Sequence, residues 1–175
     1  IEVSRGFLKH SGLSNATLRN VCIGDNSLVE NIGNYINNYT IGEECYISNV
    51  STMETTEGAT YGEGNLISVL NEVGEGNVTL FDGLNSQLAA FMVKHNADRE
   101  LRERLRQMIA EELERTLPDR GTIGFGVKIV NTREVVNTIV QDNCEVNGAA
   151  RLFDCSLLSA AGSGVYVGSG VIFEN

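Results

Sequence analysis

The sequence predicts an all-β solenoid of short parallel strands, with one helical hairpin inserted into it. Residues 23–29 (IGDNSLV) return 18 positions later as residues 41–47 (IGEECYI), with the shared pattern aliphatic, glycine, two polar residues, small, any, aliphatic. Inside this 18-residue period the aliphatic position recurs every six residues. Neither the period of a helix nor the alternation of a flat strand gives that spacing, whereas a short strand followed by a corner does.

The first coils are expected between residues 17 and 80. The six-residue frame is uninterrupted at Thr17, Ile23, Val29, Tyr35, Ile41, Ile47 and Met53. Three strand-and-corner units make a triangular coil of 18 residues, so residues 18 apart stack at the strand spacing of about 4.8 Å. Asn20 would stack on Asn38, and Asn31 on Asn49, as hydrogen-bonded side-chain ladders. A polar groove for a sugar is the alternative role for these asparagines.

The helical insertion is expected over residues 84–118. A first helix begins with Ser86 as its N-cap, and a second follows over residues 98–117 with Asp98 or Asn96 as its cap. The apolar stripe of the second helix consists of Leu101, Leu105, Met108, Ile109, Leu113 and Leu117. We expect the two helices to form a hairpin on the side of the solenoid.

The repeat resumes over residues 121–175. One of these coils is a residue short, because Val140 follows Val135 after five residues, and residues 160–164 (AAGSG) break the frame again. The chain opens and closes in repeat-like sequence. We therefore expect a single β-helix domain over residues 1–175 that belongs to a longer protein.

Composition narrows the classes of partner. The net charge of −10 argues against nucleic acid and anionic membranes, because both bind basic surfaces. No apolar run approaches the roughly 20 residues that cross a bilayer, and we expect a cytoplasmic protein. The four cysteines have neither zinc-site nor disulfide-scaffold spacing. Cys45 and Cys144 occupy the small position of the repeat, where we expect buried thiols.

The hexapeptide frame resembles that of the hexapeptide-repeat superfamily, whose fold is a single-stranded left-handed parallel β-helix. The handedness comes from this resemblance alone, because the general preference for right-handed crossovers predicts the opposite hand. The superfamily includes many bacterial acyltransferases and the C-terminal domains of some sugar nucleotidyltransferases, and its transferases are commonly trimers. The resemblance therefore implies acyl or nucleotidyl transfer to a sugar or sugar nucleotide. No cofactor is evident in the residues; acyl-CoA or a nucleotide-sugar would be the implied co-substrate.

A second resemblance covers nearly the whole chain. The order of coils, a glycine loop at residues 71–77, a helical segment, a longer helix and renewed coils is similar to a family of long hexapeptide-repeat proteins from Bacteroides-type bacteria. It implies the fold, and at most a transferase-like domain. It also implies that the chain packs against other parts of a longer protein.

The most chemically diverse side chains lie where the repeat fails. Hexapeptide acyltransferases typically use a histidine as the general base that deprotonates the attacking hydroxyl or amine. The resemblance therefore makes His95 a candidate base, with the nearby carboxylates Glu72 and Asp82 as candidate catalytic partners. Asn71 and Gln87 are candidate substrate-binding residues. The alternative is that all five cap turns and helix ends. Two distant histidines give no zinc spacing, so we expect no metal site.

Two functions remain open from the sequence. One is the transferase, with its substrate held between the coils and the insertion. The other is a non-catalytic scaffold that displays the helical hairpin for self-association or for packing within a larger protein. Contact between His95 and a carboxylate would favour the transferase, whereas His95 at an exposed helix end would favour the scaffold.

Overall fold

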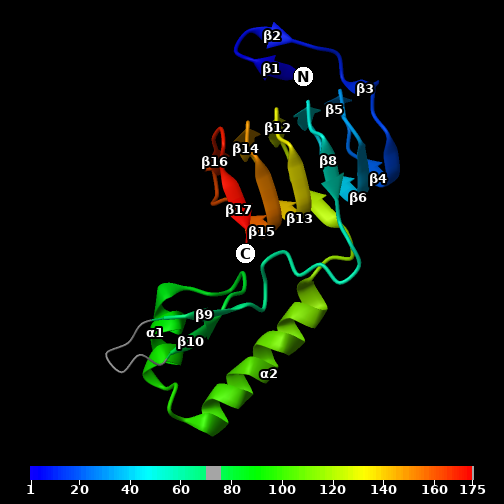
Figure 1. Cartoon of the computed structure of the whole chain (residues 1–175). Helices are drawn as coiled ribbons and strands as arrows, with labels where there is room; N and C mark the ends of the chain where they lie inside the picture. Colours follow the sequence, from blue (N-terminus) through cyan, green and yellow to red (C-terminus); the bar gives the residue numbers. More distant parts are fainter. Residues whose placement is uncertain (70–75, 175) are drawn as a thin grey trace. The chain divides into compact units, whose positions relative to one another are not determined.

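The computed structural model describes residues 1–69 and 76–174 (Figure 1). The chain forms two compact units. Unit 1 comprises Ile1–Tyr61 and Pro118–Asn175, and unit 2 comprises Gly62–Leu117. Unit 1 consists of long parallel sheets and unit 2 contains two helices, an arrangement consistent with a parallel β-solenoid that carries a two-helix insert.

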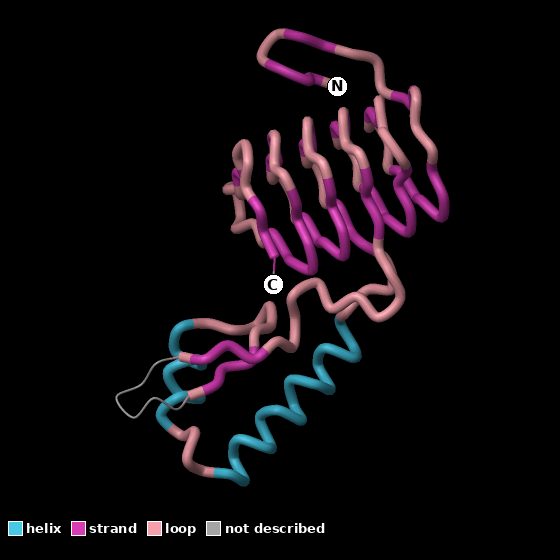
Figure 2. Tube along the Cα trace, viewed as in Figure 1, coloured by secondary structure: helices cyan, strands magenta, loops and turns pink. Residues whose placement is uncertain are grey.

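Two parallel sheets build unit 1. The six-stranded sheet contains β3 (Gly12–Ser14), β5 (Leu28–Glu30), β7 (Tyr46–Ser48), β12 (Lys128–Val130), β14 (Glu145–Asn147) and β16 (Tyr166–Val167). The seven-stranded sheet contains β4 (Leu18–Ile23), β6 (Tyr35–Ile41), β8 (Thr52–Glu54), β11 (Gly121–Ile123), β13 (Glu134–Val140), β15 (Arg151–Leu157) and β17 (Ile172–Glu174). The chain passes alternately through the two sheets, and one passage through both is termed a coil (Figure 2). A short antiparallel hairpin, β1 (Glu2–Ser4) and β2 (Phe7–Leu8), precedes the first coil.

Neighbouring coils pair residue on residue, with a coil length that varies. Val29 lies opposite Ile47, 18 residues on. Ile129 lies opposite Val146, only 17 residues on, in agreement with the short coil expected at this point. Val146 lies opposite Val167, 21 residues on, where residues 160–164 lengthen the coil. The uniform 18-residue coil was therefore wrong beyond the first repeats, because corners accept insertions that the paired strands do not.

The interior of unit 1 is a continuous apolar core that includes Val29, Ile41, Ile47 and Met53 of the expected frame. At two positions the frame is displaced by one residue. Tyr35 and Thr17 are exposed, whereas the next residues, Ile36 and Leu18, face the core. Ile36 lies opposite Met53 in the adjacent strand, so strand pairing sets its orientation. Among the cysteines, Cys45, Cys144 and Cys155 are buried as small apolar residues, and Cys22 is exposed.

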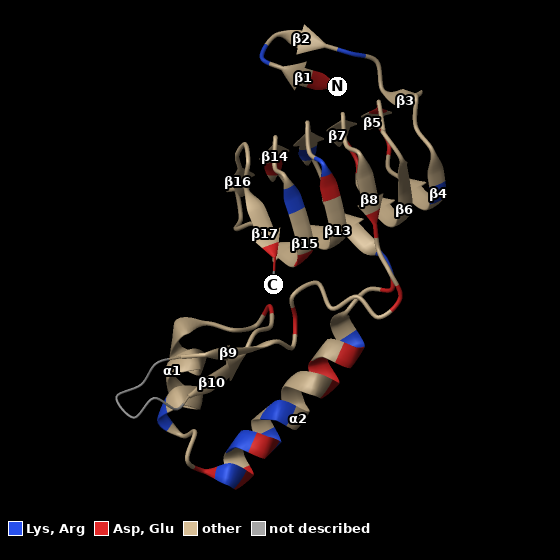
Figure 3. Cartoon of the chain, in the orientation of Figure 1, with Lys and Arg blue, Asp and Glu red and all other residues tan. Residues whose placement is uncertain are grey.

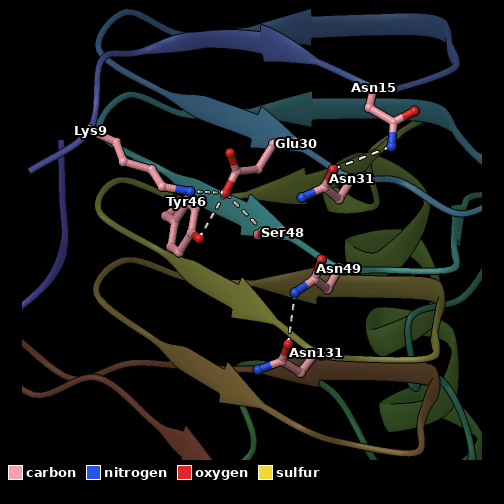
Figure 4. Close-up of polar contacts among 8 residues, drawn as sticks. All are labelled: Lys9, Asn15, Glu30, Asn31, Tyr46, Ser48, Asn49 and Asn131. Carbon is pink, nitrogen blue, oxygen red and sulfur yellow. Dashed lines mark hydrogen bonds and ion pairs between the residues drawn. The ribbon is translucent and has the colours of Figure 1, made fainter.

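The corners of the coils carry residues with positive φ, most of them asparagine. These are Asn20, Asn26, Asn31, Asn38, Asn49, Asn131, Asn137 and Asn143, with φ between 49° and 60°. Asparagine tolerates this left-handed conformation better than other residues with a side chain, which explains its repeated use. The same residues form ladders. The side-chain amide of Asn20 donates to Asn38 at 2.7 Å, as expected, and that of Asn49 donates to Asn131 at 3.0 Å (Figure 4). Asn31 accepts from Asn15 at 3.3 Å.

Glycines allow the coils to approach at another corner. Gly24, Gly42 and Gly124 belong to successive coils, and each backbone hydrogen-bonds to the next coil. A Cβ on Gly24 would lie 2.7 Å from backbone atoms of Gly42 and Glu43, closer than real side chains come. The glycine of the repeat is thus required by stacking rather than by a ligand.

Unit 2 is a small α/β unit. β9 (Leu66–Ser68) and β10 (Asn77–Thr79) were expected to continue the coils, but they pair antiparallel with each other. Helix α1 spans Ser86–Lys94 and helix α2 spans Arg99–Thr116. Asn85, not Ser86, caps α1, because the Asn85 side chain accepts from the Leu88 amide at 2.9 Å. Asp98 caps α2 as predicted.

Unit 2 has its own apolar core around Val78, Met92 and Ile109. The stripe of α2 contributes to it, except for Met108, which is 57% exposed. The outer surface of α2 carries closely mixed positive and negative side chains (Figure 3). Within the described residues, no helix is long and apolar enough to cross a membrane.

Candidate functional site

The structure places His95 at the C-terminal end of α1, as its C-cap. Its backbone N–H donates to the Phe91 carbonyl at 3.1 Å, and its half-buried ring stacks against the Phe91 ring with centroids 4.6 Å apart. In the described part of the chain, no hydrogen bond joins the His95 ring to a carboxylate. A helix C-terminus is a favourable place for an imidazole that becomes protonated.

The other candidate residues are dispersed or lie outside the described residues. Asp82 is exposed in the turn before α1, and Gln87 is exposed in the first turn of α1. Asn71 and Glu72 lie outside the described residues. Geometry therefore gives the candidate acyl-transfer group no assembled centre within the part that can be described.

Glu63 is a carboxylate that the sequence analysis did not single out. Its side chain accepts a hydrogen bond from the Asp82 backbone N–H at 2.9 Å. Burial raises the pKa of the Glu63 carboxyl, and the neighbouring Asp82 charge raises it further, while the bond from the Asp82 amide acts in the opposite direction. The only sequence signal is its place in residues 61–67, a loose copy of the repeat that does not form a coil.

The most distinctive local arrangement is the point where the chain leaves unit 1. Glu54 of β8 lies opposite Asn37, and Gly121 of β11 lies opposite Tyr39 on the same strand. The single residue between those partners is Asn38. Residues 55–120 therefore stand where the neighbouring coil has one corner asparagine. The coil on the other side has Asn137 at the equivalent place, between partners of β8 and β11.

The asparagine ladder continues through this interruption. The Asn38 side-chain amide donates to the carbonyl of Thr55 at 3.3 Å and to that of Asp119 at 3.2 Å, so it holds both departing stems. From the next coil, the Asn137 side-chain oxygen accepts from the Thr56 backbone N–H at 2.9 Å and its hydroxyl at 3.1 Å. The stems thus provide the polar groups that a corner asparagine would have provided.

The first stem continues along later coils. The Thr60 hydroxyl donates to the Asp154 carboxylate, at 3.0 Å to its nearer oxygen. The Ser156 hydroxyl donates to the Tyr61 carbonyl at 2.8 Å. The buried Tyr61 hydroxyl in turn donates to the carbonyl of Pro118 at 3.1 Å, which joins the two stems. Each of these side chains bonds to the stem, so this part of the surface is structurally committed.

Inside the interrupted coil, Tyr39 fills the space behind the stems. Its hydroxyl donates to the Thr138 carbonyl at 3.0 Å and accepts from the Thr138 N–H at 3.2 Å, so its ring reaches past the β11 strand. A Cβ on Gly121 would lie 2.2 Å from a ring carbon of Tyr39. Burial strongly raises the pKa of Tyr39, and the hydroxyl is therefore neutral and serves packing rather than acid–base chemistry.

A second polar cluster ties the segment after β2 to the six-stranded sheet (Figure 4). The Lys9 ammonium contacts one Glu30 carboxylate oxygen at 2.6 Å, and the hydroxyls of Tyr46 and Ser48 donate to the same oxygen at 3.0 and 3.2 Å. The bond from Lys9 lowers the pKa of the Glu30 carboxyl, and the Tyr46 hydroxyl adds to that effect. No group of three His, Cys, Asp or Glu side chains in the described residues could hold a metal ion.

The model of one protein family matches residues 1–175, and its description is "Domain of unknown function (DUF4954)". The chain belongs to the DUF4954 family. No curated protein and no solved structure matches it. Argument about the function of this DUF4954 chain therefore starts from its geometry.

Proposed function

We propose that this DUF4954 chain is a non-catalytic β-helix scaffold that displays unit 2 as a binding module. The observation that carries the proposal is the replacement of one corner residue by residues 55–120, with strand pairing kept on both sides. The coils do not need the insertion for their register. The inserted unit has its own apolar core, so it does not need the coils to bury its apolar side chains.

The proposed scaffold is a left-handed parallel β-helix of the hexapeptide-repeat type, with triangular coils. Three positive-φ residues per coil support three corners: Asn26, Asn31 and Asn38 mark one coil. The small buried residues Ser27 and Cys45 at one corner agree with the six-residue pattern. The hand rests on the resemblance of the sequence frame. A crystal structure of the chain would reveal it, and right-handed coils would contradict this part of the proposal.

The test of the scaffold is to replace residues 55–120 by a single asparagine that joins Glu54 to Gly121. The new residue would occupy the ladder position between Asn38 and Asn137. We expect a soluble protein that unfolds cooperatively and keeps its β-sheet circular dichroism signal, because the pairing of β6 with β13 across β8 and β11 needs only one residue at the corner.

The matched control is the same deletion joined by valine. A left-handed conformation costs a residue with a Cβ about 1–2 kcal/mol, and valine has no amide for the ladder. The asparagine-joined protein should therefore be the more stable of the two in chemical denaturation. If neither protein folds, unit 2 is part of the solenoid's own structure and the scaffold proposal fails.

A transferase is the second candidate, and Glu63 is the observation that favours it. A carboxyl group with a raised pKa can act as a general acid, and this one lies beside the Asp82 backbone in the turn before α1. Thermal-shift measurements with acyl-CoA and nucleotide sugars would test it, since a ligand at 100 times its dissociation constant stabilises by about 2.7 kcal/mol. A shift that Glu63→Gln abolishes would favour the transferase over the scaffold.

A further inference from the structure

In unit 2, the strand β9 presents an open edge. It pairs only with β10 among the described strands. The Val69 N–H donates to the Gly76 carbonyl at 2.7 Å and the Leu80 N–H to the Asn65 carbonyl at 2.8 Å. Backbone groups alternate in direction along an antiparallel strand, so those of Leu66 and Ser68 point away from β10. An exposed edge with apolar side chains is a template for pairing with another chain.

The face of this hairpin borders an apolar groove of about 250 Å³ within unit 2. Leu66 and Thr79, which lie directly opposite each other, line it from the strands, and Ile109, Ala110 and Leu113 line it from α2. The Leu66 side chain is 54% exposed, although its neighbours in the groove are apolar. The volume is slightly below the range typical of drug-sized ligands, which suits a single amino-acid side chain.

Arg106 is the charged residue in the lining of this groove. It is half-buried, and its guanidinium forms no ion pair among the described residues, whose ion pairs on α2 are limited to Arg115 with Glu112. One turn earlier, Arg102 adds a second positive charge, and its guanidinium donates to the Asn96 carbonyl at 3.1 Å. A partner that enters the groove beside Arg106 should therefore carry a carboxylate.

We propose that β9 binds an extended peptide as an additional strand, with an apolar residue in the groove and an acidic residue two positions away facing Arg106. Directly opposed residues of neighbouring strands have their side chains on the same face. A peptide residue opposite Leu66 therefore faces the groove, and the residue two positions along faces it too. Main-chain hydrogen bonds to Leu66 and Ser68 give affinity, and the two side chains give specificity.

This inference rests on the proposed function of unit 2 as a binding module. The test uses the full 175-residue chain and blocked heptapeptides of serine and threonine that carry one leucine and one glutamate two positions apart. Binding is measured by fluorescence anisotropy, and backbone amide shifts locate the site. We expect binding that perturbs Leu66–Ser68, and a loss of about tenfold or more when lysine replaces the glutamate.

Two pairs of variants give the matched controls. Arg106→Glu should weaken binding about tenfold or more, whereas Arg104→Glu, an exposed change on the same helix, should leave it within about twofold. Ala110→Leu fills the groove and should weaken binding similarly, whereas Ala90→Leu on the exposed side of α1 should not. All four substitutions retain good helix formers, so folding is expected to persist.

Equal binding of the glutamate and lysine peptides, or equal effects of Arg104→Glu and Arg106→Glu, would overturn the inference. So would the absence of binding by every member of a peptide set in which the apolar residue and the spacing are varied. The deletion that joins Glu54 to Gly121 separates the two proposals. If it folds while the full chain binds none of the peptides, the scaffold stands and only the peptide site is rejected.

Discussion

Unit 1 and unit 2 bury their apolar side chains in different ways. In unit 1 each coil covers the next, so a residue such as Ile47 is buried between paired neighbours on both sides. In unit 2 a two-stranded hairpin and two helices share a core of few buried residues around Met92. The first arrangement is extended by adding coils, and the second is complete but thinly covered. The difference explains why the stable framework and the accessible groove lie in different units.

The largest expected effect separates the two cores. Ile47→Ala should lower the free energy of unfolding of unit 1 by about 2–5 kcal/mol, because it leaves a cavity in a fully buried position. Met92→Ala should chiefly increase hydrogen exchange in unit 2 and change the main unfolding transition little. Denaturant titration together with amide exchange would measure both. Equal shifts of the main transition by the two variants would mean that the units unfold as one.

The corner at which the insertion leaves should be the next most sensitive place. Asn38→Ala should destabilise the protein by about 2–4 kcal/mol, because it combines left-handed strain with the loss of amide bonds to Thr55 and Asp119. Asn38→Gly removes only the amide and should cost less. Asn143→Ala, at a corner with a similar φ of 58°, is the control for strain alone. A loss in Asn143→Ala as large as in Asn38→Ala would show that the amide bonds contribute nothing.

A smaller effect is expected at the N-terminus of α2. Asp98→Ala should cost about 1 kcal/mol, since the Leu101 N–H loses its acceptor at 3.1 Å. The change should appear as faster amide exchange in the first turn of α2, with unit 1 unaffected. Glu114→Ala, on the exposed surface of the same helix, should leave exchange in that turn unchanged.

The smallest effect concerns acid sensitivity of unit 1. The Glu30 carboxyl has a lowered pKa in the folded state, so its contribution is present above the unfolded value near 4.5 and is lost as pH falls through the lower folded value. Glu30→Gln should therefore flatten the decline in stability below about pH 4.5 relative to the wild type. Denaturation midpoints between pH 3 and 6 would measure it, and identical slopes in the two proteins would contradict the assignment.

The sequence predicted most of unit 1 because stacking repeats its constraints. Gly24, Ser27 and Asn20 each answer a local requirement that recurs in the next coil, so the pattern is visible in one dimension. The displacement from Tyr35 to Ile36 was not visible, because it depends on which residue of a neighbouring strand lies opposite. The helices of unit 2 were also predictable, from the caps and the apolar stripe of α2.

Unit 2 was predicted less well where its structure depends on non-repeated contacts. β9 and β10 have the composition of further coils, and only their pairing with each other distinguishes them. Glu63 gained its raised pKa from burial and from Asp82, 19 positions away in sequence. The candidate residues His95, Asp82 and Gln87 were chosen for chemical diversity near a break in the repeat, and such proximity in sequence does not set the direction of side chains.

The corner occupied by residues 55–120 has a consequence for how such chains can diversify. Each coil has corners of the same conformation, and successive coils are separated by about 4.8 Å along the stack. A domain grafted at the equivalent corner of another coil would be moved along the axis by a multiple of that step, without a new linker or a change in any strand. Three such corners per coil would also direct grafts to three sides. The solenoid can thus act as a ruler on which the height and the direction of an attached module are set independently.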